Sequence, residues 1–171
     1  MVNHSSPLGP GVSEALSRAA TVEPSIARPA GPRLAVLACQ DRRMDVMRIL
    51  GLSAGEAYVI RNAGGILDDG ARRSLAISQH ALGVTEIIVM HHTDCGMSRI
   101  EDEAFLALLE QRTGARPTWS PGGFAGRSAE EHLRDVLADL AADPFIPDGA
   151  GAHGLLYDVA TGAISSLDTV S

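Results

Sequence analysis

The chain has 171 residues and a formal net charge of −7, with 45% hydrophobic and 20% charged residues, and this length predicts a single domain with a full core. The acidic balance argues against general nucleic-acid binding, which needs clustered Lys and Arg to displace counterions from phosphates. Because no apolar run approaches the roughly 18 residues of a membrane span, and the first residues lack the basic segment of a secretory signal, we expect a cytoplasmic protein without a membrane partner.

Residues 1–32 are expected to form an N-terminal arm. Five prolines in this stretch prevent long regular structure, although a short helix over residues 13–20 would share an apolar face with Val12 and Leu16. An apolar stripe without a core of its own predicts that the arm packs against a second subunit. Residues 33–171 then form a single α/β domain that carries the site.

Predicted strands and helices alternate after the arm. Asp68 is the predicted N-cap of one helix and Gly83 its stop, and Ser128 with Glu131 forms a capping box at the start of another. The alternation predicts an α/β fold in which a mostly parallel central sheet, of order 2-1-3-4, is flanked by helices, with the last two strands forming a hairpin. The expected elements are strands at 34–38, 57–61, 86–90, 154–159 and 164–167, and helices at 45–50, 69–82, 101–111 and 129–141.

The two cysteines of the chain each lie just past a predicted buried strand, inside a short polar cluster. Cys39 begins the segment CQDRR, residues 39–43, and Cys95 belongs to HHTDCG, residues 91–96. Strand ends of a parallel sheet are where α/β proteins build binding sites. In the strand order 2-1-3, Cys39 and His92 would emerge side by side at the same edge, since adjacent strands are about 4.8 Å apart.

These residues predict a metal site. Two thiolates and an imidazole are ligands that zinc prefers, and His92 and Cys95 have the H-x-x-C spacing of a ligand pair. With Cys39 they make a three-ligand site whose fourth position is left for water or for Asp41, an arrangement typical of catalytic zinc. The alternatives are a structural zinc site with Asp41 as fourth ligand, a single disulfide, and two inert buried thiols.

Asp41 and Arg43 are the predicted catalytic pair beside the metal. A zinc ion neutralised by two thiolates acidifies its water less than one bound by three histidines, so a carboxylate that accepts a hydrogen bond from hydroxide is needed. Arg43 can hold Asp41 bidentately. His91 points to the opposite face of its strand from His92 and is expected to be buried and hydrogen-bonded. Asp94 either orients a ligand or caps its loop.

The segments CQDRR (39–43), VIRNAGG (59–65) and HHTDCGM (91–97) resemble the β-class carbonic anhydrases, in particular their short bacterial branch. The similarity extends over residues 33–162, which is most of the chain. One departure is Arg42, which adds a positive charge near the predicted pair and could compete with its neighbouring arginine for the aspartate.

The resemblance implies both a ligand set and an assembly. By resemblance, Cys39, His92 and Cys95 bind one zinc ion per subunit, and Asp41 with Arg43 forms a dyad beside it. Some members of the family place the aspartate on zinc in a closed, inactive state. The family forms homodimers or larger homo-oligomers, with sites near the subunit interface and an N-terminal arm that reaches across it.

The activity implied is that of a zinc-dependent carbonic anhydrase (carbonate dehydratase), a lyase. It would catalyse the reversible hydration of carbon dioxide to bicarbonate and a proton by zinc-bound hydroxide. One alternative is a hydrolase of carbonyl sulfide or carbon disulfide on the same scaffold. Another is a non-catalytic zinc or thiol-switch module, in which Asp41 would stay on the metal permanently.

Overall fold

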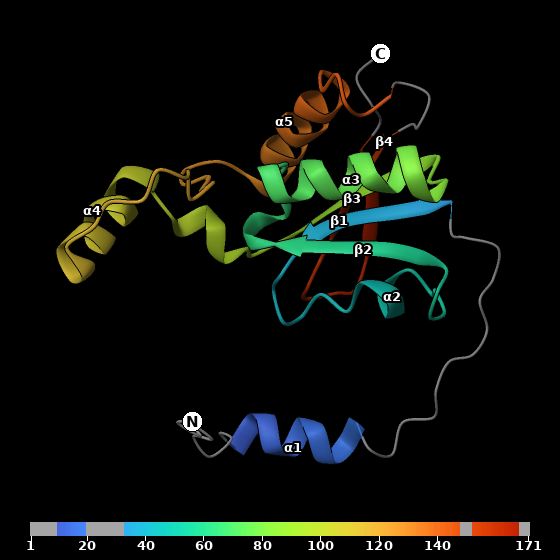
Figure 1. The fold of residues 1–171 in the computed structure, drawn as a ribbon, viewed down its shortest axis with the longest axis horizontal. Coiled ribbons are helices and arrows are strands. Elements are labelled where there is room, and N and C mark those ends of the chain that lie inside the picture. The colour runs from blue at the N-terminus through green and yellow to red at the C-terminus, as the bar shows by residue number, and fades with distance from the viewer. Residues whose placement is uncertain (1–9, 20–32, 148–151, 168–171) are drawn as a thin grey trace, which may run out of the picture.

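The centre of the computed structural model, which describes residues 10–19, 33–147 and 152–167, is a five-stranded sheet (Figure 1). The strands are β1 (Leu34–Cys39), β2 (Ala57–Asn62), β3 (Glu86–His92), β4 (Ala152–Tyr157) and β5 (Ile164–Leu167). They lie in the order β2-β1-β3-β4-β5; the first four are parallel and β5 is antiparallel to β4. The predicted α/β class, strand order and closing hairpin are therefore confirmed.

Helices cover both faces of this sheet. The helices of the described ranges are α1 (Pro10–Ala19), α2 (Val46–Ile49), α3 (Asp69–Leu82), α4 (Asp102–Thr113) and α5 (Ala129–Ala141), with 3₁₀ turns η1 (Ala63–Gly65) and η2 (Gly96–Arg99). Figure 1 shows α3 and α5 on one side of the sheet and α2 on the other, while α4 projects away from it. Within the described ranges, no helix has the length and apolar character needed to cross a membrane.

Side-chain caps set the helix ends where the sequence predicts them. The Asp68 carboxylate accepts a hydrogen bond from the backbone N–H of Ala71 at 2.7 Å, and Gly83 ends the same helix with φ of 81°. At the start of α5, Ser128 and Glu131 form the predicted capping box. These local interactions satisfy backbone groups that a helix end would otherwise leave without partners.

Two apolar clusters, one on each face, bury the strands. Alternate residues of β1 point to opposite faces, so Ala35 and Leu37 pack with α3 and α5 whereas Val36 and Ala38 pack with α2. A strand buried on both faces needs the continuous apolar run that this segment has. The helix residues in the first cluster are Ala71, Leu75, Leu133, Val136, Leu137 and Leu140.

The structure extends several predicted elements. Helix α1 begins at Pro10 rather than at residue 13, because proline is tolerated in the first helical turn; residue 20 lies outside the described residues. Strands β1 and β3 continue through Cys39 and His92, since Cys39 pairs with Asn62 and His92 pairs with Tyr157. The extra pairing places both side chains at the very ends of neighbouring strands.

Candidate metal centre

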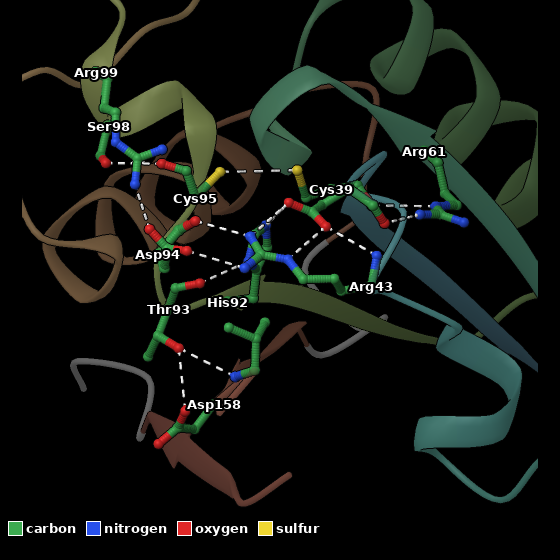
Figure 2. Close-up of polar contacts among 12 residues, drawn as sticks. Cys39, Arg43, Arg61, His92, Thr93, Asp94, Cys95, Ser98, Arg99 and Asp158 are labelled. Carbon is green, nitrogen blue, oxygen red and sulfur yellow. Dashed lines mark hydrogen bonds and ion pairs between the residues drawn. The ribbon is translucent and has the colours of Figure 1, made fainter. Parts of the chain in front are cut away.

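Cys39, His92 and Cys95 bring their ligand atoms to one buried point at the end of β1 and β3. These atoms all lie within 4.8 Å of one another. The strands are parallel neighbours, so their carboxyl ends meet at one edge of the sheet, and Cys95 follows three residues later in the loop. Figure 2 shows the two sulfur atoms facing each other, and their separation is 3.8 Å.

This geometry fits a zinc ion. Two Zn–S bonds of about 2.3 Å at a tetrahedral angle hold their sulfurs about 3.8 Å apart, whereas a disulfide needs about 2.05 Å; both cysteines are free. The His92 Nδ1 lies 2.8 Å from the carbonyl of Thr93 and donates to it, so Nε2 carries the lone pair. That Nε2 is buried without a hydrogen-bond partner among the described residues, which is the state of a metal-ligating nitrogen.

The electrostatics of the cluster also favour a cation. The Cys95 thiol donates a hydrogen bond that lowers the pKa of Cys39 to about 4, and the same sharing of one proton raises the pKa of Cys95. Burial lowers the pKa of His92, but the Cys39 sulfur, the hydrogen bond to the Thr93 carbonyl and the Asp41 carboxylate together outweigh it and raise that pKa overall. A bound divalent ion would displace the shared proton and hold both sulfurs as thiolates.

Arg43 holds the Asp41 carboxylate beside this cluster. Its backbone N–H and Nε both donate to Oδ1 at 2.9 Å, and Nη2 donates to Oδ2 at 2.8 Å. These bonds keep the pKa of Asp41 well below its usual range, so the carboxylate stays ionised. Its Oδ2 lies 3.9 Å from His92 Nε2. Arg42 is exposed and provides none of the bonds described here, so Arg43 is the arginine that holds the aspartate.

Asp94 contacts the other side of the Arg43 guanidinium. Arg43 Nη1 donates to Asp94 Oδ2 at 3.0 Å and Nη2 donates to the Asp94 carbonyl at 2.9 Å. Arg99 binds the second carboxylate oxygen of Asp94. Arg43 first, and then Arg99, lower the pKa of Asp94. The sequence left open whether Asp94 orients a metal ligand or caps its loop; in the structure it is a partner of Arg43.

Backbone contacts that sequence reasoning missed fix the segment between Cys39 and Asp41. Arg61, on β2, donates from Nε to the Cys39 carbonyl at 3.1 Å and from Nη2 to the Asp41 carbonyl at 2.7 Å. On the other side, Gly65 packs so closely that a Cβ would lie 3.0 Å from the Cys39 nitrogen. The only early signal for Arg61 was its place near the end of the neighbouring strand.

Comparisons with known proteins agree with this geometry. The sequence pattern of the family described as carbonic anhydrase matches residues 34–164. The chain is 45% identical over 139 residues to β-carbonic anhydrase 1 of Mycobacterium tuberculosis, covering 81% of this chain and 84% of the relative. The chain belongs to the β-carbonic anhydrase family. The resemblance seen in the three sequence segments is thereby confirmed.

Two further relatives differ in how much of this β-carbonic anhydrase chain they match. The crystal structure of carbonic anhydrase from Streptococcus mutans superposes with a TM-score of 0.77 at 32% identity, covering 92% of this chain and 94% of that one. A carbon disulfide hydrolase of Acidianus is 41% identical over 90 residues, which are 53% of this chain and 44% of the relative. The first similarity spans nearly the whole fold and the second spans half of it.

A stack of rings lies beside the candidate metal site of this β-carbonic anhydrase, and one of its members, Phe124, packs in the same buried cluster as Cys39 and Cys95. His91 is buried, as predicted, and its ring nitrogens lie 3.2 Å and 3.3 Å from the carbonyls of Gly65 and Ala129. His132 of α5 stacks between His91 and Phe124, with ring centroids 4.9 Å and 4.2 Å away. His132 was missed in the sequence, although its spacing on α5 places it on the buried face.

Proposed function

We propose that the chain catalyses the reversible hydration of carbon dioxide to bicarbonate and a proton, with Cys39, His92 and Cys95 holding one zinc ion per subunit. The observation that carries this proposal is the buried, unpartnered His92 Nε2 facing two sulfurs that are 3.8 Å apart. Three protein ligands leave one position of a tetrahedral ion exchangeable, as catalytic zinc requires. Family membership supports the choice of reaction.

When bound, zinc supplies a Lewis acid that lowers the pKa of water at its open position. The ionised Asp41 is placed to accept a hydrogen bond from the water that attacks carbon dioxide, and so to aim its lone pair. Arg43 holds this carboxylate through three hydrogen bonds and keeps it from taking up the proton itself. In the reverse direction, the same pair would orient the hydroxyl group of bicarbonate.

The test is metal analysis and stopped-flow carbon dioxide hydration across pH on one purified sample. Cys39→Ser and Cys95→Ser should lose zinc and activity together, because each removes a thiolate ligand. Asp41→Ala should retain zinc and lose about 100-fold in kcat or more. Asp139→Ala, which removes an exposed carboxylate from α5, is the matched control. Full activity in Asp41→Ala would refute the role of Asp41, and a metal-free wild type would refute the site.

A second candidate reaction is the hydrolysis of carbon disulfide or carbonyl sulfide. The partial match to a carbon disulfide hydrolase favours it, and these substrates are also linear and apolar. Sulfide release measured beside carbon dioxide hydration distinguishes the two reactions. Higher kcat/KM with carbon disulfide than with carbon dioxide would replace the first proposal by this one.

A non-catalytic zinc module would require Asp41 as a permanent fourth ligand. Both oxygens of this carboxylate are instead engaged by Arg43, so the structure favours a free fourth position. Hydration activity that stays absent at alkaline pH in zinc-loaded protein would support the non-catalytic module.

We also propose how the protein assembles and where in the cell it lies. We retain the division into an arm, residues 1–32, and a catalytic domain, residues 33–171, and a homodimer or larger homo-oligomer built through the arm. The exposed Val12 and Leu16 of α1 support it. The cytoplasm is the proposed compartment, because a reducing environment keeps the two adjacent thiols available to a metal.

A further inference from the structure

We propose that Asp94 is a positioning residue, which anchors Arg43 and through it keeps the Asp41 carboxylate turned away from the metal. The inference rests on the function proposed above, because it concerns the exchangeable position of that site. Asp94 makes no contact with substrate or metal in this role. It acts by holding the group that holds Asp41.

The Arg43 guanidinium lies between two aspartates. It makes four hydrogen bonds, two to Asp41 through Nε and Nη2 and two to Asp94 through Nη1 and Nη2. Figure 2 shows Asp94 and Arg43 facing each other from different loops. A guanidinium is planar and rigid, so fixing one edge of the plane fixes the direction of the other. The orientation of Asp41 is therefore coupled to that of Asp94.

Asp94 has a defined backbone conformation and is also bound by a second arginine. Its backbone has a φ of 52°, in the left-handed region that aspartate tolerates better than most residues. Arg99 of η2 binds the carboxylate oxygen that Arg43 leaves free. Asp94 also directly precedes Cys95, whose carbonyl accepts a hydrogen bond from the Ser98 hydroxyl at 2.8 Å. The anchor thus belongs to the same loop as a proposed metal ligand.

Asp41 lies close enough to the candidate metal site that a change in its orientation would affect the exchangeable position. Its Oδ2 is 3.9 Å from His92 Nε2, so a carboxylate released from Arg43 needs only a small rotation to reach an ion held by that nitrogen. It would then occupy the position that water needs. Loss of the hydrogen bonds between Arg43 and Asp94 should therefore favour the closed state, in which Asp41 is bound to the metal.

Two variants separate the carboxylate from the backbone conformation. Asp94→Gly removes the carboxylate and tolerates the positive φ, and Asp94→Asn removes the charge while keeping the size and a similar tolerance of that φ. Arg134→Gln is the control, because it breaks an exposed ion pair with Glu130 on α5. All three proteins would be prepared with cobalt(II) in place of zinc, so that the metal environment is visible in the absorption spectrum.

The measurement is azide affinity from spectral titration of the cobalt(II) proteins, because azide needs the exchangeable position. Both Asp94 variants should bind cobalt fully and bind azide about three- to tenfold more weakly than wild type, the range expected for losing a charge-assisted hydrogen bond. In the zinc forms, kcat for carbon dioxide should fall with little change in KM. Arg134→Gln should match wild type in each measurement.

A double variant distinguishes positioning from general distortion of the loop. Adding Asp41→Ala to Asp94→Gly should restore azide affinity, because the competing carboxylate is gone. Unchanged azide affinity in the single Asp94 variants, or failure of Asp41→Ala to restore it, would overturn the inference. A wild-type protein that binds no cobalt or does not hydrate carbon dioxide would instead overturn the proposed function.

Discussion

Adjacent histidines on β3 have opposite environments, and this difference shows what single residues contribute. His92 Nε2 has no hydrogen-bond partner in the described part of the chain, and it lies beside the Cys39 and Cys95 sulfurs as a metal-ligating nitrogen would. On the other face, His91 and His132 stack as buried rings, and burial lowers the pKa of both. Alternation along the strand points the two side chains in different directions, so His92 joins the cysteine sulfurs while His91 joins the ring stack.

His132 should make the protein sensitive to acid. Burial, followed by the nearby His91 and Arg127, lowers its pKa to about 4 in the folded state, against about 6.5 in the unfolded chain. Between these values the unfolded chain binds more protons, so the free energy of unfolding falls as pH decreases.

In His132→Phe, which preserves the stack without a titrating group, the loss of stability between pH 7 and pH 5 should be smaller by about 1–2 kcal/mol. Urea denaturation at a series of pH values measures this difference. Parallel stability curves for the variant and the wild type would contradict the assignment.

The turn η1 shows how a short element shapes the site. It connects β2 to α3 and carries two glycines with positive φ, 85° at Gly64 and 67° at Gly65. Gly65 also lies against the end of β1, where a Cβ would come 3.0 Å from the Cys39 nitrogen and 3.1 Å from the Ala38 carbonyl carbon. The turn therefore needs glycine both for its conformation and for its close contact with the end of β1.

Gly65→Ala should lower both stability and zinc content. The strained φ alone should reduce the free energy of unfolding by about 1–3 kcal/mol, and the contact with β1 should displace Cys39. Gly83→Ala is the matched control, since Gly83 has a φ of 81° but a Cβ there meets nothing within 4 Å. Both variants should lose stability in chemical denaturation, and only Gly65→Ala should lose zinc. Full zinc occupancy in Gly65→Ala would rule out the coupling.

At the scale of the whole molecule, the two faces of the sheet are covered unequally. The face beneath α3 and α5 has the larger buried cluster, whereas the other is covered by the four-residue α2 and has Leu34, Ile88 and Leu155 only half-buried. Helix α1 lies apart from the sheet in Figure 1, with Val12 51% and Leu16 56% exposed. Apolar surfaces of this kind are typical of chains that complete their core by association.

Replacing Val12 and Leu16 together by Glu should weaken the proposed assembly. Wild-type protein should sediment at twice the 17.9 kDa chain mass or more, and the double variant should show an apparent Kd at least about tenfold higher, because two apolar contacts are lost and charges are buried. Ser17→Glu adds charge to α1 away from the stripe formed by Val12 and Leu16 and serves as the control. Equal masses for the wild type and the double variant across a dilution series would show that α1 is not the contact.

Much of the fold could be predicted because its signals are local. The apolar runs of the strands, the Asp68 cap and the Ser128–Glu131 capping box each depend on residues within a few positions of one another. Residue types at the strand ends predicted the roles of Cys39 and Asp41, and the family resemblance implied the same roles. The sequence predicts ends for β1 and β3 that are one and two residues too early, because pairing with neighbouring strands extends them through Cys39 and His92.

The sequence alone thus determined the fold class and the strand order, and it pointed to the polar residues and cysteines that gather near the strand ends. Only the tertiary structure decided that Asp94 binds Arg43, 51 positions away, that Arg61 holds two carbonyls of the Cys39–Asp41 segment, and that His132 stacks on His91. Secondary structure follows from periodicity and capping between near neighbours. Contacts between distant side chains depend on strand register and on the rotamers that packing allows. Neither can be predicted from local sequence patterns.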